Sequence, residues 1–95
     1  MHASVRRYRV RDMDAIVSKV ESDFAEQVKK VEGFVGYYVI DGGDGTAASV
    51  TVCETADSVA EATLLSGNWV RENIADLVSG DPEVTVGEVR VRAER

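Results

Sequence analysis

The sequence contains very little cysteine, histidine or proline, with one of each among its 95 residues: Cys53, His2 and Pro82. A single cysteine cannot form an internal disulfide. One histidine and one cysteine, far apart in the chain, do not supply the ligands of a typical protein metal site, so we expect no metal and no cofactor. Cys53 also lacks a histidine that would activate it as a nucleophile.

Long hydrophobic runs and clusters of positive charge are also missing. No stretch approaches the roughly 18 apolar residues of a membrane span, and the N-terminal residues lack the apolar core of a signal peptide. We therefore expect a cytoplasmic protein with no membrane partner. The formal net charge is −6, and no basic run is longer than Arg6-Arg7. This balance repels polyanions and argues against a nucleic-acid partner.

The length favours a single domain over residues 1–95. A chain of this size can bury a core without disulfides, but one more buried surface would stabilise it considerably. No proline-rich or low-complexity linker interrupts the sequence. We therefore expect a partner chain.

The clearest local signal is the glycine-rich stretch Asp41-Gly42-Gly43-Asp44-Gly45. Its glycines and aspartates accept the positive φ angles of a tight reversal. The segments 34–40 and 47–53 on either side are rich in β-branched, aromatic or small residues. This pattern predicts a β-hairpin.

Two helices are predicted outside the hairpin. Asp12 is the expected N-cap of the first helix, and Gly33 the residue that ends it. Apolar residues recur between them at steps of three and four, on one helical stripe: Met13, Ile16, Val17, Val20, Phe24, Val28 and Val31. For the second helix, Ser58 and Glu61 resemble a capping box, and Gly80-Asp81-Pro82 is the expected end.

Short apolar strands at 3–10 and 84–91 complete the order strand, helix, strand, strand, helix, strand. Right-handed crossovers place both helices on one face of a four-stranded antiparallel sheet. The predicted fold is α+β, ferredoxin-like βαββαβ, with the first and third strands inside the sheet. Arg6, Arg7 and Arg9 would then lie on an interior strand.

The two hairpin strands are apolar on both faces, because alternate side chains point to opposite sides. Tyr38 and Ile40 share one face, and Tyr37 and Val39 share the other. Two helices cover only one of these faces. We therefore predict a homodimer through the uncovered face.

A helical wheel places Trp69, Asn73 and Ser66 on the face of the second helix that meets the sheet. One interpretation is a ligand pocket in which an aromatic ring lies beside two hydrogen-bonding groups. The alternative is that Trp69 is a core residue and Asn73 bonds a nearby backbone or side-chain group.

The first strand leaves two interpretations open as well. Its arginines, Arg9 among them, could hold an anionic ligand, or they could pair with Glu54 and Glu88 on neighbouring strands. Tyr8 and Tyr37 could be pocket walls or ordinary packing residues.

Several segments resemble the dimeric α/β barrel superfamily, and most closely its antibiotic biosynthesis monooxygenase type. They are Gly33-Phe34-Val35-Gly36, Val52-Cys53-Glu54-Thr55 and Asn68-Trp69-Val70. The resemblance implies two sheets paired into a barrel and a pocket beside Trp69. The histidine of haem-degrading relatives is replaced by Ser79. The asparagine and tyrosine that flank the tryptophan of cofactor-independent members are replaced by Leu65 and Ala75.

We therefore expect a monooxygenase-like protein that binds, and without a cofactor oxidises, an aromatic or conjugated small molecule. The alternative is a non-catalytic dimeric barrel, a binding or stress-related module. No catalytic residue is assigned. The predicted substrate-binding residues are Trp69, Asn73, Ser66, Tyr37, Tyr8 and Arg9.

Overall fold

The computed structural model describes all 95 residues. Its elements are β1 (His2–Val10), α1 (Met13–Lys19), a π-helical segment (Val20–Phe24), α2 (Ala25–Val28), β2 (Phe34–Asp41), β3 (Thr46–Cys53), α3 (Ala56–Asn73), a 3₁₀ turn (Ala75–Leu77) and β4 (Val78–Glu88). None of the helices combines the length and apolar character needed to cross a membrane.

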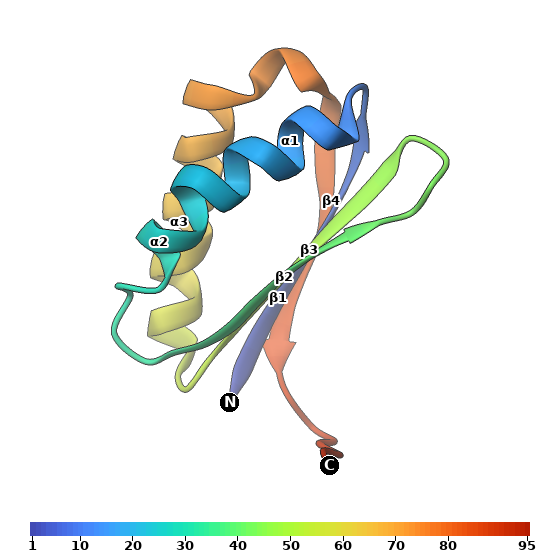
Figure 1. Cartoon of the computed structure of the whole chain (residues 1–95). Helices are drawn as coiled ribbons and strands as arrows, with labels where there is room; N and C mark the ends of the chain where they lie inside the picture. The colour runs from blue at the N-terminus through green and yellow to red at the C-terminus, as the bar shows by residue number, and fades with distance from the viewer.

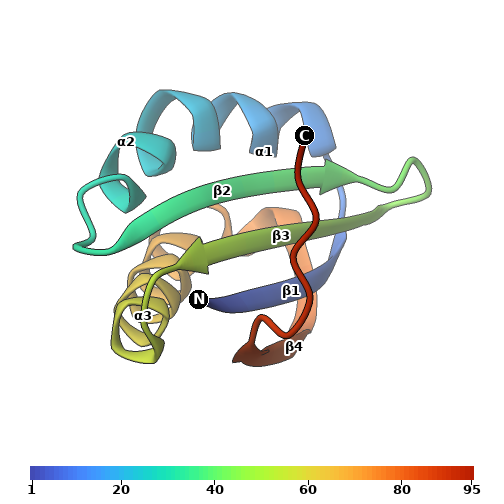
Figure 2. The same ribbon diagram turned by 90° about the horizontal axis from the view of Figure 1, so that it is seen from below.

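The strands form one antiparallel sheet in the order β2-β3-β1-β4. The helices all lie against the same face of this sheet (Figure 1). In the view of Figure 2, α1 and α2 follow β2, while α3 packs on β1 and β3. The predicted ferredoxin-like fold is confirmed, with β1 and β3 inside the sheet and β2 and β4 at its edges.

The predicted hairpin is also confirmed. Gly43 and Gly45 have φ angles of 79° and 82°, values that glycine adopts without steric cost. The Asp41 carboxylate accepts the Gly43 N–H at 2.9 Å. This loop joins β2 to β3 and extends beyond the helices (Figure 1).

The first helix begins where predicted, because Asp12 Oδ1 accepts the Ala15 N–H at 3.1 Å. Its end differs from the prediction: regular helix stops at Val28, and the chain reaches the buried Val31 through tighter turns. Gly33, with φ 85°, then turns the chain into β2.

The π-helical segment interrupts this helix at its centre. The helix buries Ile16, Val20, Phe24 and Val28, each four residues after the last. In a regular α-helix, steps of four residues drift around the axis by about 40° each. The wider π turn compensates part of that drift, so these four side chains stay on the face toward the sheet.

The predicted start of the second helix is wrong by one turn. The cap is Thr55, whose Oγ1 accepts the Ser58 N–H at 3.1 Å. Ser58 lies inside the helix and donates its hydroxyl to the Glu32 carbonyl at 2.6 Å. Thr55 stands two residues after Cys53, the buried last residue of β3, and immediately before Ala56, the first residue of α3, so its hydroxyl is in position to cap the helix.

The predicted end of that helix is also wrong. α3 ends at Asn73 and β4 begins at Val78, so Gly80-Asp81-Pro82 belongs to the strand. The register of β4 against β1 shifts between Arg7 and Arg9, and these three residues form a bulge there. An edge strand tolerates a proline at a bulge, because the missing N–H removes no required ladder bond.

The core lies between the helices and the sheet. β3 directs small buried side chains toward the helices, namely Ala47, Ser49, Thr51 and Cys53. The helices contribute the bulk, with Phe24, Val59 and Trp69 among the most buried residues. Small strand residues opposite large helical ones allow the two layers to approach closely.

The opposite face of the sheet carries no helix. Val5, Tyr38 and Ile40 are 40%, 60% and 51% exposed on it. Tyr37 and Val39 alternate with them and pack on the core. The sequence-based prediction of two apolar faces is confirmed.

Candidate functional site

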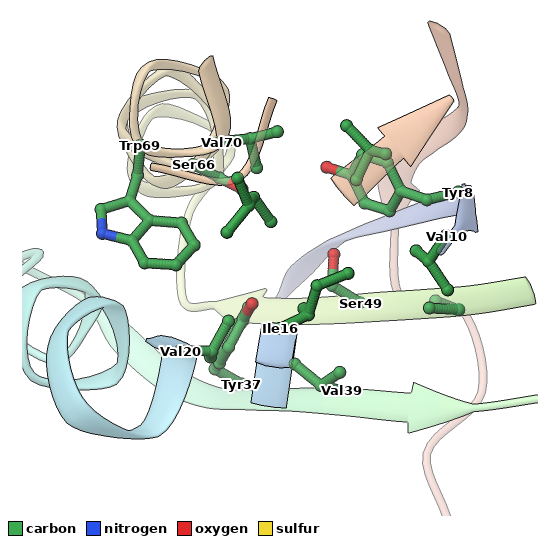
Figure 3. Close-up of a pocket in the computed structure, with 14 residues that line it drawn as sticks. Tyr8, Val10, Ile16, Val20, Tyr37, Val39, Ser49, Ser66, Trp69 and Val70 are labelled. Atoms are coloured by element: carbon green, nitrogen blue, oxygen red, sulfur yellow. The ribbon is translucent and has the colours of Figure 1, made fainter. Parts of the chain in front are cut away.

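A small apolar cavity lies between the helices and the sheet, next to Trp69. Its volume is about 40 Å³. α3 contributes Trp69, Ser66 and Val70, and β2 contributes Tyr37 on the opposite wall, while Tyr8 of β1 lies at the end away from the indole (Figure 3). One water molecule needs at least about 10 to 15 Å³, so the cavity has room for a few water molecules at most.

Trp69 is held by a hydrogen bond that points away from the cavity. Its indole N–H donates to Asp23 Oδ2 at 2.8 Å, and Gln27 Nε2 donates to Asp23 Oδ1 at 2.8 Å. These bonds, the one from Trp69 foremost, hold the pKa of the Asp23 carboxyl below its usual value. Because Asp23 lies in the π-helical segment, that irregular turn also orients the tryptophan.

Phe24, the neighbour of Asp23, supports the two aromatic walls of the cavity. Its ring centroid is 5.3 Å from that of Tyr37, with the rings inclined at 67°. It is also 5.3 Å from that of Trp69. The contact with Tyr37 is edge-to-face and the contact with Trp69 is tilted at 45°, and inclined aromatic pairs of this kind stabilise a fold beyond what apolar burial alone achieves.

The polar groups inside the cavity are hydroxyls. Ser49, Ser66, Tyr37 and Tyr8 supply them, and no carboxylate or imidazole lines the space. Burial raises the pKa of the Tyr37 hydroxyl well above its usual range. These groups can donate or accept hydrogen bonds at neutral pH, but none is poised there as a strong base.

Tyr8 separates this cavity from a larger groove on the surface. The groove measures about 400 Å³ and shares Tyr8, Val70 and Val78 with the cavity. Arg6 Nε donates to the Tyr8 hydroxyl at 2.8 Å, and the guanidinium carbon lies 5.8 Å from the ring centroid. The Tyr8 side chain is therefore held between the two spaces.

Four predicted site residues line the cavity together: Trp69, Ser66, Tyr37 and Tyr8. Their role in ligand binding stays a prediction.

Asn73 does not join them. It is exposed, and its Nδ2 donates to the Trp69 carbonyl at 3.0 Å. The expectation that it faces inward is therefore wrong. The reason is that α3 ends at this residue, and Ile74 takes the buried position and lines the cavity.

Arg9 also lies outside the cavity. It is exposed on the sheet face that the helices leave open, because Tyr8 occupies the inner face and neighbouring strand residues alternate. Arg7 shares that outer face and pairs with Glu83 at 3.3 Å, rather than with the expected Glu54 or Glu88. Arg6 is the strand arginine on the helical side.

Cys53 is fully buried, and burial raises the pKa of its thiol. No group of three or more His, Cys, Asp or Glu side chains is arranged to hold a metal ion.

Sequence reasoning missed Asp23 and the groove. Asp23 lies 46 residues from Trp69 in the sequence, and it is not a member of the apolar stripe predicted for the first helix. Arg6 could have been recognised, because strand alternation puts it on the same face as Tyr8.

No protein-family model matches the chain, and no curated protein matches its sequence. Solved structures do match its fold. One is a monooxygenase from Streptomyces coelicolor in complex with the ligand nanaomycin D, at 17% identity and TM-score 0.77, with 99% of this chain and 91% of that chain covered.

Two others are similar at TM-score 0.75. SnoaB, a cofactor-independent oxygenase from Streptomyces nogalater, is 18% identical, with 99% of this chain and 97% of that chain covered. A protein of unknown function from Nitrosomonas europaea is 14% identical, with 99% and 93% covered. The chain thus has the fold of the antibiotic biosynthesis monooxygenase-like proteins. At these identities the likeness extends to the fold alone.

Proposed function

We propose that this protein binds an aromatic or conjugated small molecule against Trp69, in the manner of a cofactor-independent monooxygenase. The observation that carries the proposal is an aromatic-walled cavity inside a fold that matches a monooxygenase in complex with nanaomycin D. Such a cavity between helices and sheet, with a few hydroxyls, has the composition of a small-molecule site.

The cavity alone is too small to hold an aromatic ligand. Ligand pockets usually measure about 300 to 1,000 Å³, whereas the cavity beside Trp69 measures about 40 Å³. The adjoining groove of about 400 Å³ supplies the missing room if the Tyr8 ring swings aside. Tyr8 then acts as the movable wall through which a planar ligand reaches Trp69.

The polar groups of the cavity are hydroxyls, so the proposed oxidation depends on the substrate and O₂ rather than on a catalytic base. Oxidation of a phenol such as 1-naphthol to 1,4-naphthoquinone consumes one O₂, with one oxygen atom entering the product and the other leaving as water. The cavity hydroxyls of Tyr37, Ser49 and Ser66 would orient the substrate oxygen. The substrate itself would supply the electrons to oxygen.

One observation favours a second candidate, a binding module without catalysis. The indole N–H of Trp69, the polar atom of the largest cavity side chain, is already bonded to Asp23. It therefore cannot also assist a reacting oxygen without breaking that bond. Binding and oxidation need separate measurements for this reason.

We also propose that the molecule is a cytoplasmic homodimer through the open sheet face. The support is the exposure of Val5, Tyr38 and Ile40 together on a face without helices, since contiguous apolar patches usually mark interfaces. Light scattering should give twice the chain mass of 10.3 kDa. Tyr38→Arg should shift the mass toward the monomer, and a wild-type monomer at all micromolar concentrations would refute the dimer.

Trp69 is the single tryptophan, so its fluorescence tests ligand binding directly. Titration with menadione, a naphthoquinone, should quench it saturably, in contrast to the linear quenching of free tryptophan. Ser66→Leu fills the cavity and should abolish the saturable component. Leu64→Phe enlarges an exposed side chain of the same helix and should leave it intact.

Oxygen uptake with 1-naphthol then separates the two candidates. Consumption of one O₂ per naphthoquinone formed, lost in Ser66→Leu, supports an enzyme. Saturable binding without oxygen uptake supports the binding module. Linear quenching of the wild type by menadione would refute a ligand site beside Trp69.

A further inference from the structure

The surface groove on the far side of Tyr8 from the cavity is lined by charged side chains, which indicate the charge that a ligand would carry. It lies between the second half of α3 and the bulged start of β4, with Tyr8 at its base. The bulge at Gly80-Asp81-Pro82 sets β4 off from β1 at this point and opens the groove. Bulges often occur next to binding sites, because they redirect the strand.

Two arginines project into this groove, Arg6 from β1 and Arg71 from α3. Neither forms an ion pair, although acidic residues outnumber basic ones by 17 to 11 in the chain. Arg6 uses its Nε on Tyr8, and its two terminal nitrogens have no hydrogen-bond partner in the protein. Asp81 is the one acidic residue that lines the groove.

Arg71 is placed over the groove by its neighbours on α3. One terminal nitrogen donates to Asn68 Oδ1. The other lies 3.6 Å from the point where a Cβ of Gly67 would stand. Glycine inside a helix is destabilising relative to alanine, and here it leaves the helix surface beneath the guanidinium open.

The groove therefore offers a ligand an apolar surface and positively charged groups next to each other. Tyr8, Val70 and Val78 form the part of the groove next to the cavity, and Arg6 and Arg71 supply its two positive charges. The remaining lining residues are Gly67, Ala75, Gly80, Asp81 and Pro82. A planar apolar body would lie against the first set while an anionic end meets the second. Guanidinium groups bind carboxylates in two-point geometry and stay charged at every physiological pH.

We propose that Arg6 and Arg71 form a carboxylate-binding site, so that the ligand of this protein is an aromatic carboxylate rather than a neutral aromatic. This inference rests on the proposed function, which supplies the aromatic part of the ligand. It adds the charged part and the two residues that recognise it.

The test compares 2-naphthoate with its neutral analogue 2-naphthamide by isothermal titration calorimetry on the full chain. Charge-assisted hydrogen bonds are stronger than neutral ones, but this groove is open to solvent, which weakens them. We therefore expect naphthoate to bind about tenfold more tightly than naphthamide. Because the attraction is electrostatic, the preference should decrease as salt is raised.

Three variants locate the effect. Arg71→Gln alters an exposed side chain and should bring naphthoate binding to within about twofold of naphthamide, with naphthamide unchanged. Arg6→Gln should do the same, and a thermal melt checks its fold because it also contacts Tyr8. Lys30→Gln removes the same charge from an exposed position that lines neither the groove nor the open sheet face, and it is the control, which should retain the tenfold preference.

The outcomes separate this inference from the proposed function. Equal binding of the two compounds, or equal losses in Arg71→Gln and Lys30→Gln, would overturn the carboxylate site and leave an aromatic pocket standing. No heat and no Trp69 response with either compound, nor with menadione, would overturn the aromatic pocket as well.

Discussion

Replacement of Phe24 by leucine tests the aromatic support of the candidate site. Phe24 is 1% exposed and contacts both Tyr37 and Trp69 at 5.3 Å between ring centroids. Leucine keeps an apolar side chain but removes both ring contacts, each of which contributes about 0.5 to 1.5 kcal/mol beyond burial. The expected loss in the free energy of unfolding is therefore about 2 kcal/mol.

Thermal unfolding followed by circular dichroism measures this loss. For a domain of this size, 1 kcal/mol corresponds to about 4 to 8 °C in Tm, so Phe24→Leu should lower Tm by about 8 to 16 °C. Trp69 emission should shift to the red, because one wall of its packing is lost. Leu64→Ala, at a side chain 66% exposed on α3, is the control and should change stability by less than about 0.5 kcal/mol. A Phe24→Leu loss as small as the control's, with unchanged emission, would refute the aromatic support.

Three further predictions concern single residues. The pKa of the Asp23 carboxyl is lowered from 3.8, so the stabilising bond from Trp69 is present above that pH and is lost as the pH falls through the folded-state pKa. The difference in Tm between the wild type and Asp23→Asn should therefore shrink below pH 3.8, and a constant difference would contradict this. Asn73→Leu removes one partly exposed hydrogen bond, so urea unfolding should show a loss of no more than about 1.5 kcal/mol in the free energy of unfolding. Menadione binding should be unchanged, and weakened binding would place Asn73 in the site. The buried Cys53 thiol should react with Ellman's reagent only after unfolding, and rapid labelling of the native protein would contradict its burial.

The fold could be predicted because its signals are local. Glycines at the turn and the alternation in the two strands on either side determine the hairpin, and Asp12 marks a helix start by its own side chain. Those features depend on a few consecutive residues. The antiparallel sheet and its order then follow from general rules of chain connection.

The details that sequence reasoning got wrong depend on contacts across the fold. Gly80-Asp81-Pro82 has the composition of a helix end, but pairing with β1 makes it a strand bulge. The helical wheel for Trp69 and Asn73 assumed that the helix continues, and α3 ends at Asn73. The composition of three residues cannot distinguish a helix end from a strand bulge.

The candidate site was only partly predictable for a similar reason. Tyr8 and Arg9 were placed in one pocket, although neighbouring strand residues face opposite sides. The bond between Trp69 and Asp23 joins residues of different helices. It depends on a π-helical turn, for which the four-residue spacing of Val20, Phe24 and Val28 was the available signal.

The direction of the Trp69 N–H bears on how this protein would recognise a ligand. Because Asp23 accepts that N–H on the outer side, the indole presents only its ring toward the cavity. A ring surface favours planar molecules but does not distinguish among them by hydrogen bonding. Selectivity must then come from polar groups elsewhere, and the guanidiniums of Arg6 and Arg71, which form no ion pair, lie at the far side of Tyr8. Trp69 would therefore determine the shape of the ligand, while the groove would determine its charge.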